Sequence, residues 1–525
     1  MMDLDRDIKK MPKIKKKGEK NAIVTLFKIV AVILLFVLQI GIMLLLYSTT
    51  RTIYNYARYI FEVIRIISVV YLLYRHDTAA YKVSWILFIM FFPVVGVISY
   101  ILWGNSKLKK QRKEELLKVQ EDTKNMLNSS DEIISKLDVY NAKLANYATK
   151  VTGYPLYENN GVEFFEIGEK FFESLKKDII NAKKYILIEF FIFSKGKLWD
   201  EIFELLKQKS KEGVKIEIIY DSLGCLFKMP KGYKDVWDEC GFKYYKFNPF
   251  IPVINGYINY RDHRKIVCID GKIAYTGGVN IADEYVNVIE RYGHWKDGGI
   301  KVLGNASWSF VLMFLRQKAQ ISKEKIDYLW YKADEEKDVK NEKQGYILPF
   351  ADGPDNRKRP TENILIQTIT NATKYVYLNT PYFIPSEVLL NSVLNAARSG
   401  VDVRIVTPHI PDKKMVQIAT RASYEVLLEA GVKVYEYKPG FIHSKTLISD
   451  DTTAIIGTSN LDFRSMHLNF ECNAWLYKTG EELAIKEDFL NMTKKCVEVK
   501  LDEWKKRPLK LKWMEAFVSG FAPML

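Results

Sequence analysis

Two stretches of the chain repeat one pattern of chemically useful side chains. The pattern reads His-x-Lys-x4-Asp-x6-Gly-x2-Asn, and the histidines and the asparagines of the two copies are each 180 positions apart (443 − 263 and 460 − 280). The first copy contains His263, Lys265, Asp270, Gly277 and Asn280, and the second contains His443, Lys445, Asp450, Gly457 and Asn460. Because the chain has only six histidines, two copies in the same register indicate a duplicated functional site rather than chance.

The residue types in each copy suit phosphoryl transfer. A neutral imidazole can attack phosphorus as a nucleophile, a nearby ammonium holds phosphoryl oxygens as a point charge, and an asparagine adds an amide donor. One copy therefore supplies half of a site, and two copies face to face supply a nucleophile, an acid for the leaving group and a pair of cations. We expect no metal ion and no cofactor, because the lysines bring the positive charge that a metal would give.

Each motif is predicted to begin on a strand that runs into a hairpin. Residues 266–269 and 446–449 are β-prone runs, followed by the turn signals Asp270-Gly271 and Asp450-Asp451. Residues two apart on a strand face the same way, so the histidine and the lysine project together. The two aspartates are motif members, but we expect them to support the hairpin turn rather than transfer protons.

Four segments, one at the start of the first motif and three that extend beyond the motifs, resemble the bacterial cardiolipin synthases of the phospholipase D superfamily. They are residues 262–265 (DHRK), 377–385 (YLNTPYFIP), 431–437 (GVKVYEY) and 460–465 (NLDFRS), and the resemblance covers roughly residues 60–525. It implies two similar lobes with one shared active site, and phosphatidyl transfer between two phosphatidylglycerol molecules to give cardiolipin and glycerol. The resemblance also implies that His263 is the nucleophile, whereas His443 protonates the departing alcohol and then deprotonates the acceptor hydroxyl. Asn280 and Asn460 are then expected to bind the substrate's phosphoryl group together with the lysines.

In this family an acid downstream of the motif orients the histidine, which can act as a base only when its far nitrogen is held. The candidate in the second half is Glu471, 28 residues after His443 (471 − 443), and the candidate in the first half is Asp297, 34 residues after His263 (297 − 263). Each acid is thereby assigned to the histidine of its own half.

Other activities stay open at this stage. The same half-sites can transfer a phosphatidyl group to another acceptor such as serine or ethanolamine, hydrolyse a phospholipid to phosphatidate, or cut nucleic acid as a membrane-tethered nuclease. A non-enzymatic membrane scaffold with a dead site is disfavoured, because histidine and lysine are intact in both copies.

Strand and helix patterns alternate twice along the chain, which predicts an α/β fold with a mixed or parallel sheet flanked by helices in each lobe. The expected lobes are residues 153–332 and 346–525, joined by a charge-dense connection at 333–344. In the second lobe, strands are expected at 375–379, 401–407 and 432–437, with helices at 387–399 and 415–430; the first lobe has the same order.

The first 150 residues read as a membrane attachment. Residues 1–21 form a lysine-rich cytoplasmic tail, residues 22–104 hold two or three transmembrane helices, and residues 105–152 form a charged helical linker or stalk. The uncharged runs are 29–47 and 83–103. The segment 54–74 carries Arg58, Glu62 and Arg65, so it either spans or lies in the interface. We expect a multi-pass protein of the cell membrane with its catalytic part on the cytoplasmic face.

Composition agrees with an anionic lipid partner. There are 78 Lys and Arg against 63 Asp and Glu, a net charge of +15, which suits phosphatidylglycerol and other anionic membrane lipids. No nucleic-acid partner is expected, and the oligomeric state stays open. Near the C-terminus, apolar residues and lysines predict a basic amphipathic helix that lies either on a bilayer or on the protein itself; its apolar residues are Leu509, Trp513, Met514, Phe517, Val518 and Phe521.

Overall fold

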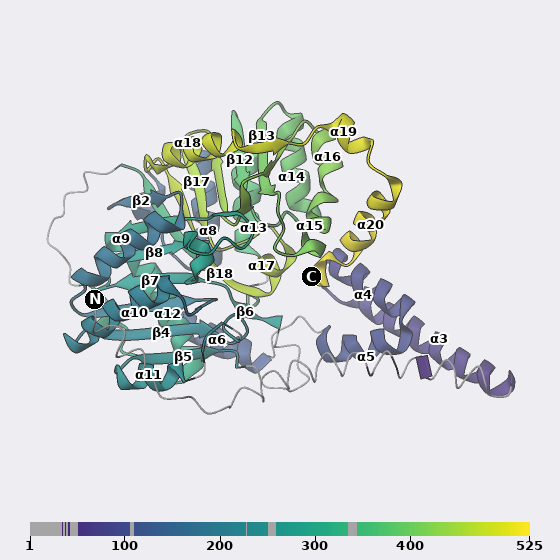
Figure 1. Cartoon of the computed structure of the whole chain (residues 1–525), viewed down its shortest axis with the longest axis horizontal. Helices are drawn as coiled ribbons and strands as arrows, with labels where there is room; N and C mark the ends of the chain where they lie inside the picture. The colour runs from purple at the N-terminus through teal and green to yellow at the C-terminus, as the bar shows by residue number, and fades with distance from the viewer. Residues whose placement is uncertain are drawn as a thin grey trace.

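Two α/β lobes lie against one another, and a group of helices from the N-terminal part of the chain projects from one side (Figure 1). The computed structural model describes residues 34, 37, 40–41, 51–104, 110–226, 228–230, 232–249, 259–333, 344–356 and 358–524. The expected basic tail at 1–21, most of the apolar run at 29–47 and most of the connection at 333–344 lie outside the described residues.

The first lobe is built on a seven-stranded sheet. In spatial order its strands are β2 (Val162–Phe165), β10 (Gly299–Leu303), β8 (Ile273–Gly277), β7 (Lys265–Ile269), β3 (Tyr185–Phe190), β4 (Lys215–Asp221) and β5 (Lys243–Phe247). The strands β3, β4 and β5 run parallel, and the remaining neighbours are antiparallel. The sheet is therefore mixed, as the sequence predicts.

Both faces of this sheet are buried. On β7, Ile266 and Cys268 join one core cluster, while Val267 and Ile269 join another. This alternation follows from the two-residue period of a strand. Helices α9 (Gly168–Asn181), α10 (Lys197–Lys211) and α11 (Tyr233–Glu239) contribute to the second cluster, and α12 (Ser307–Ser322) contributes to the first.

The second lobe repeats the arrangement around a ten-stranded sheet. Its strands in order are β1 (Tyr157–Glu158), β11 (Tyr346–Asp352), β18 (Asn469–Tyr477), β17 (Thr453–Gly457), β16 (Thr446–Ser449), β12 (Tyr375–Asn379), β13 (Asp402–Pro408), β14 (Lys433–Tyr437) and β19 (Cys496–Glu498), with β6 (Arg261–Asp262) paired to β18. Two of these strands, β1 and β6, come from the first half of the sequence.

The helices of the second lobe mostly fall where the pattern predicts them. They are α13 (Pro360–Asn371), α14 (Glu387–Arg398), α15 (Lys414–Arg421), α16 (Tyr424–Glu429), α17 (Phe463–His467), α18 (Glu481–Thr493), α19 (Leu501–Lys505) and α20 (Leu509–Gly520). The prediction of one helix over 415–430 was wrong, since α15 and α16 are separate there and Ala422 and Ser423 lie between them.

The segment expected as a helical linker or stalk packs against the lobes. It forms α6 (Lys110–Asp122), a 3-10 turn η1 (Lys124–Met126), α7 (Asp131–Ile134) and α8 (Val139–Thr152). Leu116, Ile134 and Leu144 are buried in the main core cluster, and the Trp308 indole of α12 donates to the Met126 carbonyl at 2.9 Å. The segment is thus part of the body formed by the two lobes.

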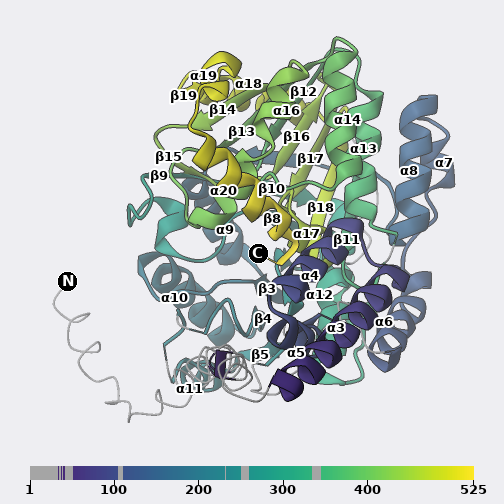
Figure 2. The same ribbon diagram turned by 90° about the vertical axis from the view of Figure 1, so that its right-hand side faces the viewer.

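Three helices precede it: α3 (Arg51–Tyr74), α4 (Ala79–Phe91) and α5 (Pro93–Trp103). The uncharged run 83–103 is not one continuous helix: α4 ends before Phe92 and α5 begins at Pro93, where a proline, which has no N–H to donate, is tolerated as a first helical residue. Across the described part of the chain, no helix combines the length and the apolarity that crossing a bilayer requires. Figure 2 shows α3, α4 and α5 beside α20 on the face turned toward the viewer.

Candidate active site

The two motifs occupy matching places in their sheets. Strand β7 pairs with β8 through a hairpin, and β16 pairs with β17 in the same way. The turns contain residues with positive φ: Asp270 (53°) and Gly271 (72°) in the first, and Asp450 (55°) and Asp451 (62°) in the second. These are the left-handed conformations that tight hairpins require.

The motif aspartates lie at the turn end of the strands, away from the histidines. The Asp270 carboxylate accepts hydrogen bonds from the backbone N–H groups of residues 183, 184 and 185 at 2.7–2.9 Å. Asp450 does the same for residues 373, 374 and 375 at 2.6–2.9 Å. Although burial alone would raise the pKa of Asp450, these donors lower it. The structure thus gives both aspartates a role in tying the hairpin to the neighbouring strand.

Each histidine is held by a carboxylate from the other lobe. Nδ1 of His263 lies 3.0 Å from both carboxylate oxygens of Glu471, and Nδ1 of His443 lies 2.6 Å from Oδ2 of Asp297. The assignment of each acid to the histidine of its own half was therefore wrong. The same four residues are present, but their partners are exchanged.

Two short parallel strand pairs between the lobes cause the exchange. Strand β6, just before His263, pairs with the start of β18, and the His263 N–H donates to the Phe470 carbonyl at 2.9 Å. Strand β15 (Gly440–Ile442), just before His443, pairs with β9 (His294–Lys296), and the His443 N–H donates to the Lys296 carbonyl at 2.7 Å. Glu471 and Asp297 are the next residues along those strands, so each projects beside the opposite histidine.

The lysines complete a compact cluster that draws on both lobes. Lys265 and Lys445 are buried; Nζ of Lys265 donates to the His263 carbonyl at 2.6 Å, and Nζ of Lys445 donates to the His443 carbonyl. Burial lowers the pKa of Lys265 to about 8 and that of Lys445 to about 7. The Lys265 charge contributes to the lowering at Lys445, so the two half-sites act on one another.

Burial favours the neutral form of both imidazoles. Burial lowers the pKa of His263, and the Glu471 carboxylate only partly opposes this. Burial, followed by the Lys445 charge, lowers the pKa of His443 to about 3. A neutral imidazole that donates Nδ1–H to a carboxylate keeps its lone pair on Nε2, which is the nitrogen that can attack phosphorus or accept a proton.

The two asparagines are not equivalent. Both polar groups of the Asn280 side chain are hydrogen-bonded: its carbonyl accepts from the Ile192 N–H at 3.1 Å and its amide donates to the Tyr285 hydroxyl at 2.8 Å. The Asn460 amide makes only a long contact of 3.4 Å to Asp462, and its buried carbonyl oxygen has no hydrogen-bond partner within the described parts of the chain.

Several supporting residues were missed by the sequence reasoning. Thr458 donates to Glu471 at 2.5 Å, whereas the matching position in the first lobe is Gly278, on which a Cβ atom would overlap the Asp297 carboxylate. The rings of Phe191 and Tyr285 lie 5.2 and 5.4 Å from His263 and His443, respectively. Positions 278 and 458 occupy equivalent places in the two copies of the motif, so the sequence repeat could have drawn attention to them. The aromatic contacts can be seen only in the fold.

Three of the other four histidines make their contacts outside this cluster. His294 lies on β9 with Nδ1 3.0 Å from the Tyr437 hydroxyl, His409 pairs with Glu436, and the His467 ring lies 4.3 Å from the Phe463 ring, tilted by 43°. In the part of the chain that the structure describes, no group of three or more His, Cys, Asp or Glu side chains could hold a metal ion.

Comparison with known proteins gives a consistent assignment. A family model described as "Cardiolipin synthase, PLD-like domain" matches residues 175–289 and 365–493, and one described as "Phospholipase_D-nuclease N-terminal" matches 63–105. A protein named cardiolipin synthase from Halalkalibacterium halodurans is 34% identical over 464 residues, 87% of this chain and 91% of the relative. Another of that name from Listeria monocytogenes is 34% identical over 460 residues, covering 86% and 95%.

Two further relatives extend the comparison. An uncharacterized protein from Streptococcus mutans is 36% identical over 465 residues, covering 87% of this chain and 99% of its own length. The crystal structure of phosphatidylserine synthase from Haemophilus influenzae shares the fold, with a TM-score of 0.56, 15% identity, and coverage of 73% of this chain and all of that one. Since the sequence similarity runs through both lobes and both motifs, this chain belongs to the family of cardiolipin synthases with phospholipase D-like domains.

Proposed function

We propose that the protein is a cardiolipin synthase, which transfers a phosphatidyl group from one phosphatidylglycerol to the hydroxyl of a second and releases glycerol. The observation that carries the proposal is the exchanged pairing of His263 with Glu471 and of His443 with Asp297, in a chain whose named relatives are cardiolipin synthases. Two oriented imidazoles beside two buried lysines form what a two-step displacement at phosphorus requires.

In the first step His263 is the nucleophile. Glu471 accepts its Nδ1–H, so Nε2 attacks the phosphorus of the donor lipid. The N–P bond forms as the bond from phosphorus to the glycerol oxygen breaks, and His443 gives that oxygen a proton. The products of the step are a phosphatidyl-histidine and free glycerol.

The second step reverses these roles. The now neutral His443 takes a proton from the free hydroxyl of the acceptor phosphatidylglycerol. The acceptor oxygen attacks the same phosphorus, the N–P bond breaks, and His263 returns to its neutral form. Cardiolipin leaves, and the proton on His443 serves the next donor.

His443 must carry a proton when the donor binds, although its pKa in the free protein is low. The donor phosphodiester brings a negative charge between Lys265 and Lys445. A nearby anion favours the protonated form of each cation and imidazole, so substrate binding raises these pKa values. The two ammonium groups then stabilise the charge that develops on the phosphoryl oxygens, and the loosely held Asn460 amide adds a donor.

We infer that residues 22–104 attach the protein to the cell membrane and that residues 1–21 form a basic tail. The catalytic lobes, 153–332 and 346–525, lie on the cytoplasmic side. This is supported by the match of residues 63–105 to the N-terminal family model, by the lysines that follow α5, and by the net charge of +15, which suits a surface rich in phosphatidylglycerol.

The test is an assay of the purified full-length protein with phosphatidylglycerol in detergent, with products identified by mass spectrometry. We expect cardiolipin and an equal amount of glycerol, and no product from His263→Ala or His443→Ala. Phosphatidate as the sole product would replace the proposal with a phospholipid hydrolase, and activity confined to oligonucleotides would replace it with a nuclease.

A further inference from the structure

The C-terminal helix α20 presents a row of large apolar side chains to solvent. Leu509, Trp513 and Phe517 are four residues apart and 72%, 76% and 60% exposed. Residues with this spacing lie on one side of a helix. Single exposed apolar residues are ordinary on a protein surface, but a contiguous row with a tryptophan at its centre indicates a surface that binds something.

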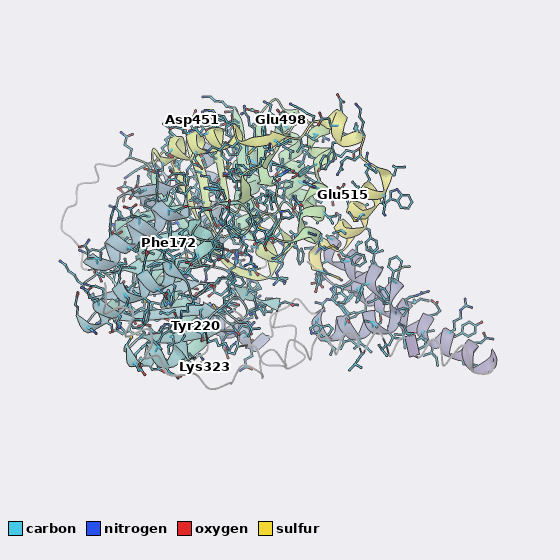
Figure 3. The ribbon with its side chains drawn as sticks, viewed as in Figure 1. Phe172, Tyr220, Lys323, Asp451, Glu498 and Glu515 are labelled. Atoms are coloured by element: carbon cyan, nitrogen blue, oxygen red, sulfur yellow. The ribbon has the colours of Figure 1, made fainter. Side chains whose placement is uncertain are left out.

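The opposite side of α20 fixes its orientation. Val518 is buried with Ala419 of α15 and Ala522. Glu515, labelled in Figure 3, is also buried and is ion-paired with Arg507 at 2.6 Å. The helix therefore cannot turn its apolar row inward without breaking these contacts, and the row is a fixed feature of the folded protein.

The end of the chain is also attached to the N-terminal helices. The Ser84 hydroxyl of α4 donates to the Gly520 carbonyl at 2.7 Å. Beyond α20, Met524 packs against the core of the N-terminal helices, which is Leu72, Tyr81, Trp85, Ile89 and Tyr100. Figure 2 shows α20 next to α4 on the face that also contains α3 and α5. The helices α3, α4 and α5 and the C-terminal helix α20 thus form one surface.

That surface is apolar on the N-terminal side as well. Large apolar residues of α3, α4 and α5 are more than half exposed, among them Ile60, Ile67, Val70, Met90, Phe91 and Ile101. Residues 63–105, which supply most of them, match the N-terminal model of the family. The row on α20 therefore continues an apolar face instead of forming an isolated patch.

Charge identifies the partner. Lys506 and Lys510 are exposed next to the apolar row, Lys505 beside them is ion-paired with Glu429 at 2.7 Å, and the whole chain carries a charge of +15. A helix with an apolar side and flanking lysines is suited to the interface of an anionic bilayer, where apolar side chains enter the acyl boundary and lysines meet the headgroups.

We propose that α20 lies in the interface of an anionic bilayer, at the base of the N-terminal helices, with Leu509, Trp513 and Phe517 facing the acyl chains. It thereby attaches the second lobe directly to the membrane from which the lipid substrates come. The inference rests on the proposed membrane attachment of the enzyme, but it concerns a different part of the chain from the one that the family model covers.

The test measures whether Trp513 touches acyl chains. The full-length protein is reconstituted into vesicles of phosphatidylglycerol and phosphatidylcholine, with or without bromine on the acyl chains. The fluorescence of Trp513 is obtained by subtracting the fluorescence of the Trp513→Phe variant from that of the wild type. Bromine quenches only in contact, so we expect this emission to fall by about half or more. The double variant Leu509→Ser, Phe517→Ser should largely abolish the quenching.

Two controls accompany the measurement. Trp330, 39% exposed on the first lobe, is isolated in the same way with Trp330→Phe and should not be quenched; Ile180→Ser, at an exposed position of α9, should leave the Trp513 signal unchanged. Trp513 emission that bromine does not change would overturn the proposal, and protection from a water-borne quencher in that case would assign the row to a second copy of the chain. Quenching without cardiolipin synthesis would uphold the inference and refute the proposed function, and synthesis without quenching would do the reverse.

Discussion

The exchange of acids between the lobes predicts which step each acid serves. A donor lipid with p-nitrophenol in place of glycerol has a leaving group that departs without a proton, so His443 is not needed in the first step. The burst of nitrophenolate then reports His263 alone, and steady-state turnover reports both histidines. Glu471→Gln should therefore slow the burst, and Asp297→Asn should leave the burst nearly unchanged and slow turnover.

The size of the effect follows from the contact that is lost. Glu471 holds Nδ1 of His263 at 3.0 Å in a buried site, and a hydrogen bond to a charged group contributes about 1.5–3 kcal/mol. At roughly 1.4 kcal/mol per factor of ten, the burst rate of Glu471→Gln should fall about ten- to a hundredfold. The amide can also hold the imidazole in the wrong tautomer, which would add to the loss.

Stopped-flow absorbance gives the burst rate and amplitude for the wild type and the two variants. His443→Ala serves as the reference, because it should show a normal burst of about one nitrophenolate per chain and little turnover. If Asp297→Asn slows the burst and Glu471→Gln does not, each acid serves the histidine of its own lobe and the reasoning from the strand pairs is refuted.

Three further predictions use other parts of the site. Burial lowers the pKa of Lys265 to about 8 and that of Lys445 to about 7, so both lysines lose their charge as the pH rises from 7 to 9. Sulfate keeps a constant charge over this range and should therefore inhibit the nitrophenolate burst less and less as the pH rises. Inhibition that stays constant would mean that the lysines stay charged. Asp450→Ala removes the acceptor for three backbone donors, and its free energy of unfolding in urea should fall by about 1–3 kcal/mol while activity per folded molecule is retained; a loss of activity at unchanged stability would assign it a chemical role. Gly278→Ala should displace the Asp297 carboxylate and lower steady-state turnover about tenfold or more, as expected when a buried charged hydrogen bond is lost. The nitrophenolate burst should stay nearly normal. Normal turnover would show that the carboxylate can move without consequence.

The duplicated motif predicts much of the site and the fold around it. Histidine and lysine two residues apart on a strand, with an aspartate in the following turn, specify where the strands β7 and β16 end and how their hairpins close. The alternation of apolar runs with helical patterns gives the strands β12, β13 and β14 to within a residue or two, since buried strands of a mixed sheet are read directly from such runs.

The relation between the lobes could not be read in this way. The pairs β6–β18 and β9–β15 are only two or three residues long, and such short contacts between distant segments leave no periodic signal. They nevertheless decide which acid reaches which histidine. The differences between the lobes, such as Gly278 against Thr458 and Tyr285 against Ser465, are visible in the sequence, but their meaning depends on neighbours that only the fold supplies.

The most direct test of the account is the site of covalent attachment. The full-length His443→Ala protein is mixed with the nitrophenyl donor and quenched in denaturant at mildly alkaline pH, where the phosphohistidine bond survives and the acyl esters stay intact. It is then digested and analysed by mass spectrometry. The account predicts one phosphatidyl group per chain, on the peptide that contains His263, and none in His263→Ala. A phosphatidyl group on any other residue, or a burst of nitrophenolate with no adduct at all, would contradict the claim that one phosphorus atom is passed between two imidazoles with separate roles.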